Sequence, residues 1–388
     1  MRVLHTSDWH LGRSFHGADI LDHQRALVTW IADLAAEREV DLVVVAGDVY
    51  DRAVPPLAAV ALWEEAVVRL TRTCPIVVTS GNHDSPTRLG FAGALLAGAG
   101  LHLRTSVGTI ADPVVVEGRD GVALATYGIP YLEPDLHREE LGAERSHASV
   151  LDAAMQRIRD DLALRAGIRS LVVAHAFITG SSAATVSDSE RDLRIGGIGD
   201  APASVFAGVD HVALGHLHGA QQVRADGDLP GVHYSGSPIA FSFSEESHVK
   251  SVTILDVPAE GEIAVERVDA PVPRPLATIT GTLEQILDDP ATAEYAEHWV
   301  RVVLTDDRRP DDPMGRLQAV MPHVVELRFE GSALSSVEAV DSDGRASTDP
   351  LAIAEAFVEH VTTTPAEPGE RALLRDSVER VRVGSVPR

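Results

Sequence analysis

Cysteine, lysine and long apolar runs are scarce or absent in this chain of 388 residues. Cys74 is the only cysteine, so no disulfide can form within the chain. No uncharged apolar segment reaches the length that spans a bilayer, and the N-terminus turns polar too early for a signal peptide. We therefore expect a cytoplasmic protein without a membrane segment.

Lys250 is the only lysine, and every other basic residue is arginine, which we interpret mainly as genomic composition bias. The sequence has no Gly-x-x-x-x-Gly-Lys-[Ser/Thr] loop, so any dependence on ATP has to come from another chain. The 58 acidic residues outnumber the 33 basic ones, which gives a net charge of −25. Taken alone, this charge argues against a nucleic-acid binder. Net charge says little about local patches, however, and two bound divalent metals would add about four positive charges at a phosphate site.

In the N-terminal two-thirds of the chain, short β-branched apolar runs each end at a polar cluster. Runs of this kind are typical of strands buried on both faces, and they lie at 41–46, 75–79, 171–174 and 211–214. Helical patterns lie near 22–38, 56–71, 88–96 and 147–165. The alternation predicts a layered α/β domain with polar residues at the strand ends, where such folds bind ligands.

The last third of the chain has a different character. Residues 259–275 mix charges with prolines and indicate a linker or domain boundary. Strand-like runs at 299–304 and 324–329, with an acidic helix at 283–287, predict a small α/β domain without chemistry of its own. Two amphipathic helical patterns follow, at 350–362 and 369–383. We divide the chain into a main domain (1–270), a capping domain (271–345) and C-terminal helices (346–388).

Five polar blocks rich in Asp, His and Asn follow the predicted strands. Each has an ordinary explanation alone, such as a helix cap or a turn, but five independent coincidences multiply to a very small chance. Mixed oxygen and nitrogen ligands suit Mn²⁺, Fe²⁺ or Zn²⁺, and the absence of thiolates argues against a structural zinc site. The blocks are Asp8-Trp9-His10, Gly47-Asp48, Gly81-Asn82-His83-Asp84, His175 and Gly215-His216-Leu217-His218.

The spacing within the blocks suits metal ligation. Residues two apart on an extended strand point the same way, so Asp8 and His10 can reach one ion. The two oxygens of Asp48 can bridge two metals about 3.5–4 Å apart. His83 is placed to meet the substrate, and Asp84 is suited to hold its ring.

The order of these blocks resembles the calcineurin-like metallophosphoesterase superfamily. The flanking sequences resemble, within it, the bacterial SbcD family of exonuclease subunits, and the similarity covers essentially the whole chain. The resemblance implies a layered β-sandwich flanked by helices, a small α/β capping domain and a C-terminal helical tail. The segments that carry it are 5–12, 47–51, 81–86, 187–191 and 234–238.

The resemblance also implies a role for each site residue. His83 would stabilise the transition state or protonate the leaving oxygen, with Asp84 orienting it. Asp51 stands where archaeal and eukaryotic relatives carry His, so its role stays open. The implied cofactor is a pair of divalent ions, with manganese as the family expectation. One ion would be held by Asp8, His10, Asp48 and His218, and the other by Asp48, Asn82, His175 and His216.

The activity that the resemblance implies is metal-dependent DNA cleavage in repair, recombination and replication. It would combine exonuclease action on double-stranded ends with endonuclease action on single strands or hairpins. The implied partners are DNA and an SbcC-type coiled-coil ATPase docked on the terminal helices. A homodimer through 56–71 and 88–96 would complete a heterotetramer.

Softer assignments concern residues beside the blocks. Arg13, Arg52 and Arg88 could contact phosphates, although a solvated or ion-paired arginine is the commoner case. The polar stretch 179–199 is long for a connection and would form a substrate-facing loop.

Two rival functions stay open at this point. Another superfamily enzyme, such as a phosphoprotein phosphatase or a small-molecule phosphodiesterase, would need neither a capping domain nor tail helices. A non-catalytic DNA-end-binding scaffold with structural metals would have no use for a histidine that is not a ligand, such as His83.

Overall fold

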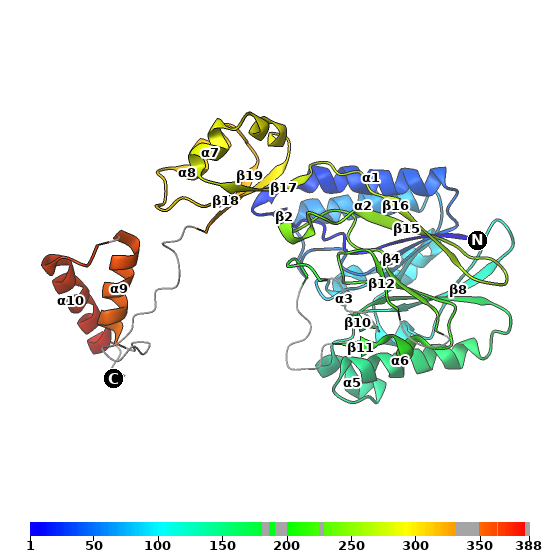
Figure 1. Cartoon of the computed structure of the whole chain (residues 1–388). Coiled ribbons are helices and arrows are strands. Elements are labelled where there is room, and N and C mark those ends of the chain that lie inside the picture. The colour runs from blue at the N-terminus through cyan, green and yellow to red at the C-terminus, as the bar shows by residue number, and fades with distance from the viewer. Residues whose placement is uncertain (181–185, 191–199, 225–228, 331–348, 363, 385–388) are drawn as a thin grey trace. The chain divides into compact units, whose positions relative to one another are not determined.

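The computed structural model describes residues 1–180, 186–190, 200–224, 229–330, 349–362 and 364–384 (Figure 1). The chain forms two compact units, Met1–Pro275 and Leu276–Arg388. No helix within the described ranges is long and apolar enough to cross a membrane.

The first sheet of the larger unit has six strands in the order β16-β15-β1-β4-β5-β6. β1, β4, β5 and β6 run parallel, while β15 pairs antiparallel with β1 and β16 pairs antiparallel with β15. The strands are β1 (Arg2–Thr6), β4 (Leu42–Ala46), β5 (Ile76–Thr79), β6 (Leu101–Arg104), β15 (Ser251–Asp256) and β16 (Ala264–Asp269).

The second sheet also has six strands, in the order β13-β14-β12-β9-β8-β7. Its four inner strands are parallel, and the two edge strands run antiparallel to their neighbours. The strands are β7 (Val114–Glu117), β8 (Ala123–Ile129), β9 (Arg169–His175), β12 (His211–Gly215), β13 (Gln221–Gln222) and β14 (Gly231–Tyr234). Two short ribbons pair β2 (Ser14–Phe15) with β3 (Ala18–Asp19), and β10 (Ile178–Thr179) with β11 (Ala201–Pro202).

The two sheets pack face to face and bury an apolar layer between them. Val3, Val44 and Val77 of the first sheet meet Leu124 and Val173 of the second in one buried cluster. Because successive strand residues point to opposite faces, each sheet also has an outer apolar face that helices cover. This arrangement confirms the predicted layered sandwich flanked by helices.

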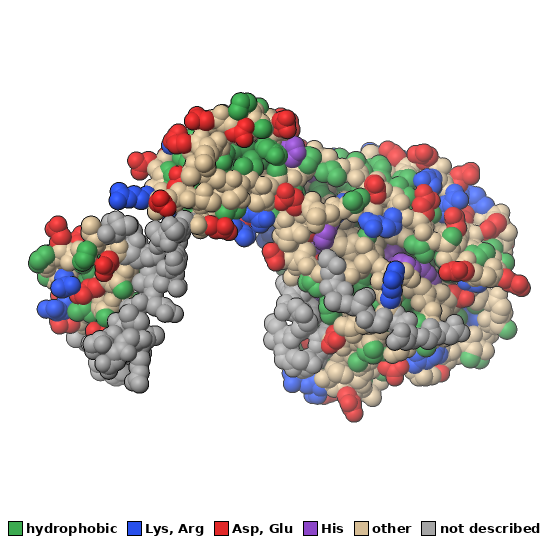
Figure 2. All heavy atoms as spheres, viewed as in Figure 1, with side chains coloured by type: hydrophobic (Ala, Val, Ile, Leu, Met, Phe, Trp, Pro, Cys, Tyr) green, Lys and Arg blue, Asp and Glu red, His purple; other side chains and the backbone are tan. Residues whose placement is uncertain are grey.

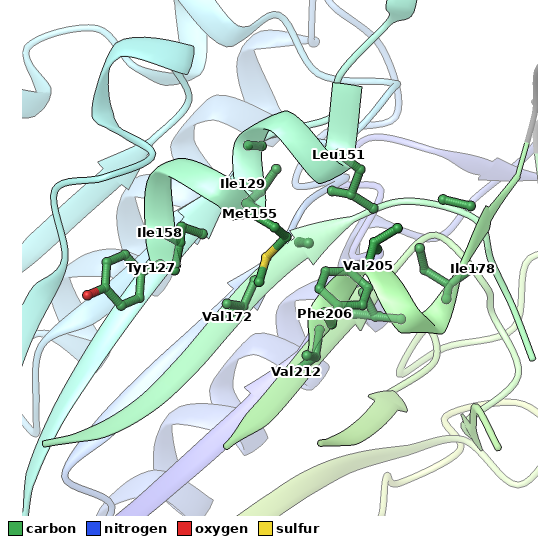
Figure 3. Packing of buried hydrophobic residues seen from close by; sticks show 14 of the residues in the cluster. Tyr127, Ile129, Leu151, Met155, Ile158, Val172, Ile178, Val205, Phe206 and Val212 are labelled. Carbon is green, nitrogen blue, oxygen red and sulfur yellow. The ribbon is translucent and has the colours of Figure 1, made fainter. Parts of the chain in front are cut away.

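The outer face of the second sheet is covered by α6 (His147–Leu162), which follows α5 (Pro134–Leu141). Figure 3 shows Met155 and Ile158 of this helix over Val172 and Val212 of the sheet, in one cluster with Phe206. The hydroxyl of Ser146 caps α6 by accepting the backbone N–H of Ser149. The short, polar α5 is not predicted by the helical patterns in the sequence.

The first sheet is flanked by α1 (Leu21–Glu37) and α2 (Leu57–Leu70), which pack against each other (Figure 1). The continuous helix predicted near 88–96 is wrong. The structure has two single-turn helices, α3 (Pro86–Leu89) and α4 (Gly93–Leu96). Ala92, between them, has a φ of 58°, which a continuous right-handed helix does not allow.

The smaller unit contains a parallel sheet of β17 (Leu276–Gly281), β18 (Trp299–Leu304) and β19 (Val324–Phe329). Leu283 and Ile286 of α7 (Leu283–Asp288) and Leu317 of α8 (Pro313–Gln318) cover it in one buried cluster. The helices α9 (Pro350–Thr362) and α10 (Pro368–Gly384) follow, joined by an ion pair of Glu355 with Arg371 at 2.9 Å. The strands and helices predicted for this region agree with these bounds to within one or two residues.

The linker or boundary predicted at 259–275 ends where the two units divide, at Pro275. A linker is wrong for its middle part, because β16 pairs with β15 along all six of its residues. This edge strand is largely exposed, so charged residues replace the apolar pattern that marks inner strands. Most of the predicted loop at 179–199 falls on residues 181–185 and 191–199, which lie outside the described residues.

Candidate metal centre

The five polar blocks meet at one edge of the sandwich because they follow parallel strands. In the first sheet, β1, β4 and β5 end at Thr6, Ala46 and Thr79, directly before or close to a block. In the second sheet, β9 ends at His175 and β12 ends at Gly215. Ligand sites of α/β folds lie at the carboxyl ends of such strands.

The backbone turns sharply at four of the predicted ligands. Asp8, His10, Asp48 and His216 have φ values of 54°, 44°, 50° and 113°, in the left-handed region. They are half of the eight non-glycine residues with positive φ in the described part of the chain. Such conformations cost on the order of 1–3 kcal/mol each and persist where the surroundings enforce them, often at functional sites.

Two glycines let these turns approach one another. A Cβ on Gly81 would lie 2.2 Å from Oδ1 of Asp48, and a Cβ on Gly47 would lie 2.4 Å from Nδ1 of His175. Gly47 also has a φ of 82°. Any side chain at either position would displace a predicted ligand, which explains why glycine precedes Asp48 and Asn82.

Asp8, His10 and His218 form one tight group, in which one ligand atom from each lies within 4.8 Å of the others. The Nε2 atoms of His10 and His218 are 3.1 Å apart. The carboxylate of Asp8 accepts the backbone N–H of His216 through both oxygens, at 3.1 Å each. All three side chains of the group are buried.

His175, Asn82 and Asp48 form a second convergence. Nδ1 of His175 lies 2.9 Å from the carbonyl oxygen of Ala46, which can only accept, so the proton of the neutral ring sits on Nδ1. The Nε2 lone pair then faces Oδ1 of Asn82 at 2.8 Å and Oδ2 of Asp48 at 3.6 Å. Three acceptors that point at one another fit a bound cation.

His216 lies beside this second convergence. Its ring centroid is 5.4 Å from that of His175, and the side chain is buried. Three groups within the described residues have ligand atoms close enough for one ion, and His216 belongs to none of them.

Burial dominates the electrostatics of the centre. It lowers the pKa of His10, His175, His216 and His218, so each imidazole is neutral, the form that ligates metals. Burial, followed by the negative charge of Asp48, raises the pKa of Asp8 well above its usual value. A divalent cation relieves this crowding of buried carboxylates, so the donor set fits divalent metals.

His83 stands at the rim of the centre, with its backbone N–H donating to Oδ1 of Asp48 at 2.9 Å. Its Nδ1 lies 2.7 Å from the carbonyl oxygen of Asp51 and therefore donates to it. The ring sits edge-on to that of His10, with centroids 4.7 Å apart.

The predicted pairing of Asp84 with the His83 ring is wrong. The carboxylate of Asp84 instead accepts backbone N–H groups from Val49, Tyr50 and Gly81, at 3.1, 2.9 and 2.9 Å. Asp84 therefore ties two ligand loops together, and burial followed by Asp48 raises its pKa to about 7. The oxygen that orients the His83 ring comes from the main chain at Asp51, which no side-chain pattern reveals.

The three candidate arginines differ in how they are held. Nη2 of Arg13 donates to the carbonyl oxygen of Ser189 at 3.0 Å, and the guanidinium lies over the ring of Phe241 at 5.0 Å. The side chain of Arg52 is 61% exposed, and its Nη2 lies 3.8 Å from the carboxylate of Asp51. Arg88 donates to the carbonyl oxygen of Ala53 at 2.9 Å. Arg52 is thus the most available of the three for a ligand.

Sequence reasoning missed a buried group behind His218. Ser189, Glu245 and Lys250 lie there, all less than a tenth exposed, and Nδ1 of His218 is 2.6 Å from Oγ of Ser189. No spacing rule connects these residues. The available signals were the single lysine and the segment 187–191, which holds Ser189 and was noted only for its resemblance.

Comparisons with known proteins follow the division into two units. The calcineurin-like phosphoesterase family model matches residues 1–220. The model described as the type 5 capsule protein repressor C-terminal domain (SbcD_C) matches residues 272–362. The solved structure of TT1561 from Thermus thermophilus is 13% identical, with a TM-score of 0.41, and covers 69% of this chain and 98% of that one.

Full-length relatives are closer in sequence. The SbcD component of the SbcCD nuclease of Escherichia coli K12 is 34% identical over 337 residues, which cover 82% of this chain and 82% of that protein. The protein of the same name from Escherichia coli O157:H7 matches to the same extent. The chain therefore belongs to the calcineurin-like phosphoesterase family, within the group of SbcD nuclease subunits.

Proposed function

We propose that this chain is a metal-dependent DNA nuclease that cleaves double-stranded ends, single strands and hairpins in repair, recombination and replication. The observation that carries the proposal is the convergence of Asp48, Asn82 and His175 acceptors beside the group of Asp8, His10 and His218. The chain is 34% identical to a nuclease component, and family models match segments in both units. This similarity supports DNA as the substrate.

The proposed ligand sets share Asp48. Asp8, His10 and His218 would complete one position with it, and Asn82, His175 and His216 the other. Mn²⁺ is the proposed ion, because the family resemblance implies it and the mixed carboxylate, amide and imidazole donors suit it as they suit Fe²⁺ or Zn²⁺. When bound, the two ions supply Lewis acidity that activates water and neutralises phosphate charge.

His83 is the proposed acid of the reaction. Its Nδ1 is committed to the carbonyl oxygen of Asp51, so Nε2 is the atom left to face a substrate. From there it would give a proton to the leaving oxygen or stabilise its charge. The bond from its backbone N–H to Asp48 anchors the main chain of His83 beside the ligands.

The proposed assembly is a cytoplasmic heterotetramer of two such chains and two SbcC-type ATPase chains on DNA. Exposed apolar residues suit both contacts. Leu57, Phe91 and Leu95 are 80% or more exposed and favour a homodimer through α2, α3 and α4. Phe357 and Leu373 are exposed on α9 and α10, which favours docking of the ATPase there.

The charge of the chain is compatible with DNA if the attraction is local. Figure 2 shows acidic side chains spread over the visible surface instead of gathered in one patch. Arg13, Arg52 and Arg88, with the two metals, would supply positive charge beside the centre. The ATPase partner would supply the rest.

The test is cleavage of single-stranded and hairpin DNA by the purified chain with Mn²⁺, beside His83→Ala. We expect cleavage by the wild type and a loss of about 10²–10⁴-fold in the variant with both metals retained. Bis-p-nitrophenyl phosphate serves as a generic diester. Its turnover without DNA cleavage, even with the ATPase and ATP, would favour a small-molecule phosphodiesterase. Metal and DNA-end binding without turnover of either substrate would favour a scaffold.

A further inference from the structure

Lys250 is held entirely inside the protein. Its side chain is 5% exposed, immediately before β15. The ammonium donates to three acceptors, which are the carboxylate of Glu245, the carbonyl oxygen of His218 at 3.1 Å and Oγ of Ser237 at 3.0 Å. An ammonium has three N–H groups, so every donor is used.

The chemistry of this position explains why it is a lysine. The chain has one lysine among 33 lysine and arginine residues, so every other basic residue is an arginine. A guanidinium is larger and planar, with five donors, and would leave buried N–H groups unsatisfied here. Three acceptors in a closed pocket therefore suit a compact cation with three donors.

The partner of Lys250 is Glu245, whose side chain is fully buried. One oxygen of its carboxylate takes the Lys250 ammonium. The other accepts the hydroxyl of Ser189 and the backbone N–H of Phe241 at 3.3 Å, and lies 3.4 Å from Nδ1 of His218. A buried carboxylate requires such compensation, and removing one partner leaves the other charge unpaired.

The chain of hydrogen bonds ends on a predicted ligand. The hydroxyl of Ser189 has one proton, and that proton goes to Glu245, which only accepts. Its oxygen, 2.6 Å from Nδ1 of His218, must therefore accept an N–H from the ring. Nδ1 is then the protonated nitrogen of His218, and Nε2 offers its lone pair toward His10 and the first metal position.

We propose that Lys250 and Glu245 are positioning residues that act through Ser189 to fix the Nδ1–H tautomer of His218 and so set the affinity of the metal position that it shares with Asp8 and His10. The inference rests on the two-metal centre proposed above. It predicts an effect on one metal position and not on the other, since Nδ1 of His175 is held by the carbonyl oxygen of Ala46.

The experiment is a titration of the metal-free full chain with Mn²⁺, followed by electron paramagnetic resonance and calorimetry. The wild type is compared with four variants: Lys250→Met, Lys250→Arg, Ser189→Ala and the control Arg38→Met. Arg38 pairs with Glu266 at the surface, so its loss tests the removal of an ordinary ion pair. Circular dichroism establishes that each variant is folded.

We expect two Mn²⁺ sites in the wild type and in Arg38→Met. In Lys250→Met and Lys250→Arg, one site weakens by about 10–100-fold while the other keeps its affinity. Ser189→Ala, which leaves the ion pair intact, weakens the same site by about 10-fold. A general loss of structural integrity would weaken both sites, so the selectivity identifies positioning.

Wild-type affinity at both sites in a folded Lys250→Met protein would overturn the inference and leave the nuclease proposal standing. If that variant does not fold, Ser189→Ala decides in the same way. Failure of the wild type to bind Mn²⁺ would instead remove the metal centre, and the inference with it.

Discussion

The two halves of the metal centre hold their histidines by different means. His175 is fixed by a main-chain carbonyl, that of Ala46, and by the tight approach of Gly47. His218 is fixed by side chains, through Ser189 and Glu245. The first half is thus built by the packing of one sheet on the other, whereas the second half depends on residues that single substitutions can remove.

In the proposed ligand sets Asp48 belongs to both halves, so its loss should have the largest effect. We expect Asp48→Ala to reduce DNA cleavage by about 10⁴-fold or more, because two metal positions each lose about 100-fold in affinity. Mn²⁺ titration beside the cleavage assay checks this. If the variant still binds two ions with little change in affinity, Asp48 is a ligand of neither ion.

A methyl group on a close-approach glycine should disturb Asp48 without removing any ligand. Gly81→Ala puts a methyl group 2.2 Å from Oδ1 of Asp48, so we expect a loss of about 1–3 kcal/mol in unfolding free energy and weaker metal binding. Gly98→Ala is the matched control, since a Cβ there meets no atom within 4 Å. Urea unfolding of both variants measures the difference, and equal stabilities would contradict the close approach.

A smaller change in the His218 half removes one hydrogen bond and leaves the buried ion pair. Ser237→Ala removes one of the three acceptors of Lys250 but leaves the ion pair with Glu245. We expect one Mn²⁺ site to weaken by only a few-fold, less than for the loss of Lys250 itself. A larger effect than that of Lys250→Met would show that Ser237 acts on the centre by another route.

A separate pH effect concerns the contact between the sheets next to the centre. His5 on β1 is fully buried, its Nε2 is 3.0 Å from the carbonyl oxygen of Leu214 on β12, and burial lowers its pKa to about 3. The folded state keeps His5 neutral while the unfolded state protonates below its usual pKa of 6.5. The contribution of neutral His5 to the free energy of unfolding is therefore fully present above pH 6.5. This contribution decreases as the pH drops toward 3.

The measurement is urea unfolding of the metal-free wild type and of the His5→Gln variant between about pH 7.5 and 4. The variant should have a pH slope that is shallower by roughly 1.4 kcal/mol per pH unit below about pH 6. Identical slopes would show that His5 is not buried in its neutral form.

The sequence predicted the parts that a local pattern governs. Val43, Val44 and Val45 mark an inner strand, and parallel strands that end together bring distant blocks such as Asp8 and His216 to one edge. The edge strand β16 was missed because exposed strands carry no apolar run. The roles of Asp84 and Lys250 were missed because they depend on main-chain partners and on contacts between residues far apart in the chain.

The proposed pair of divalent ions at the strand ends shares Asp48. Anomalous diffraction at the manganese edge, from crystals grown with Mn²⁺, would locate both ions. We expect two peaks on either side of Asp48, one against His10 and His218 and the other against Asn82 and His175. No peak, or a single peak that does not touch Asp48, would contradict it.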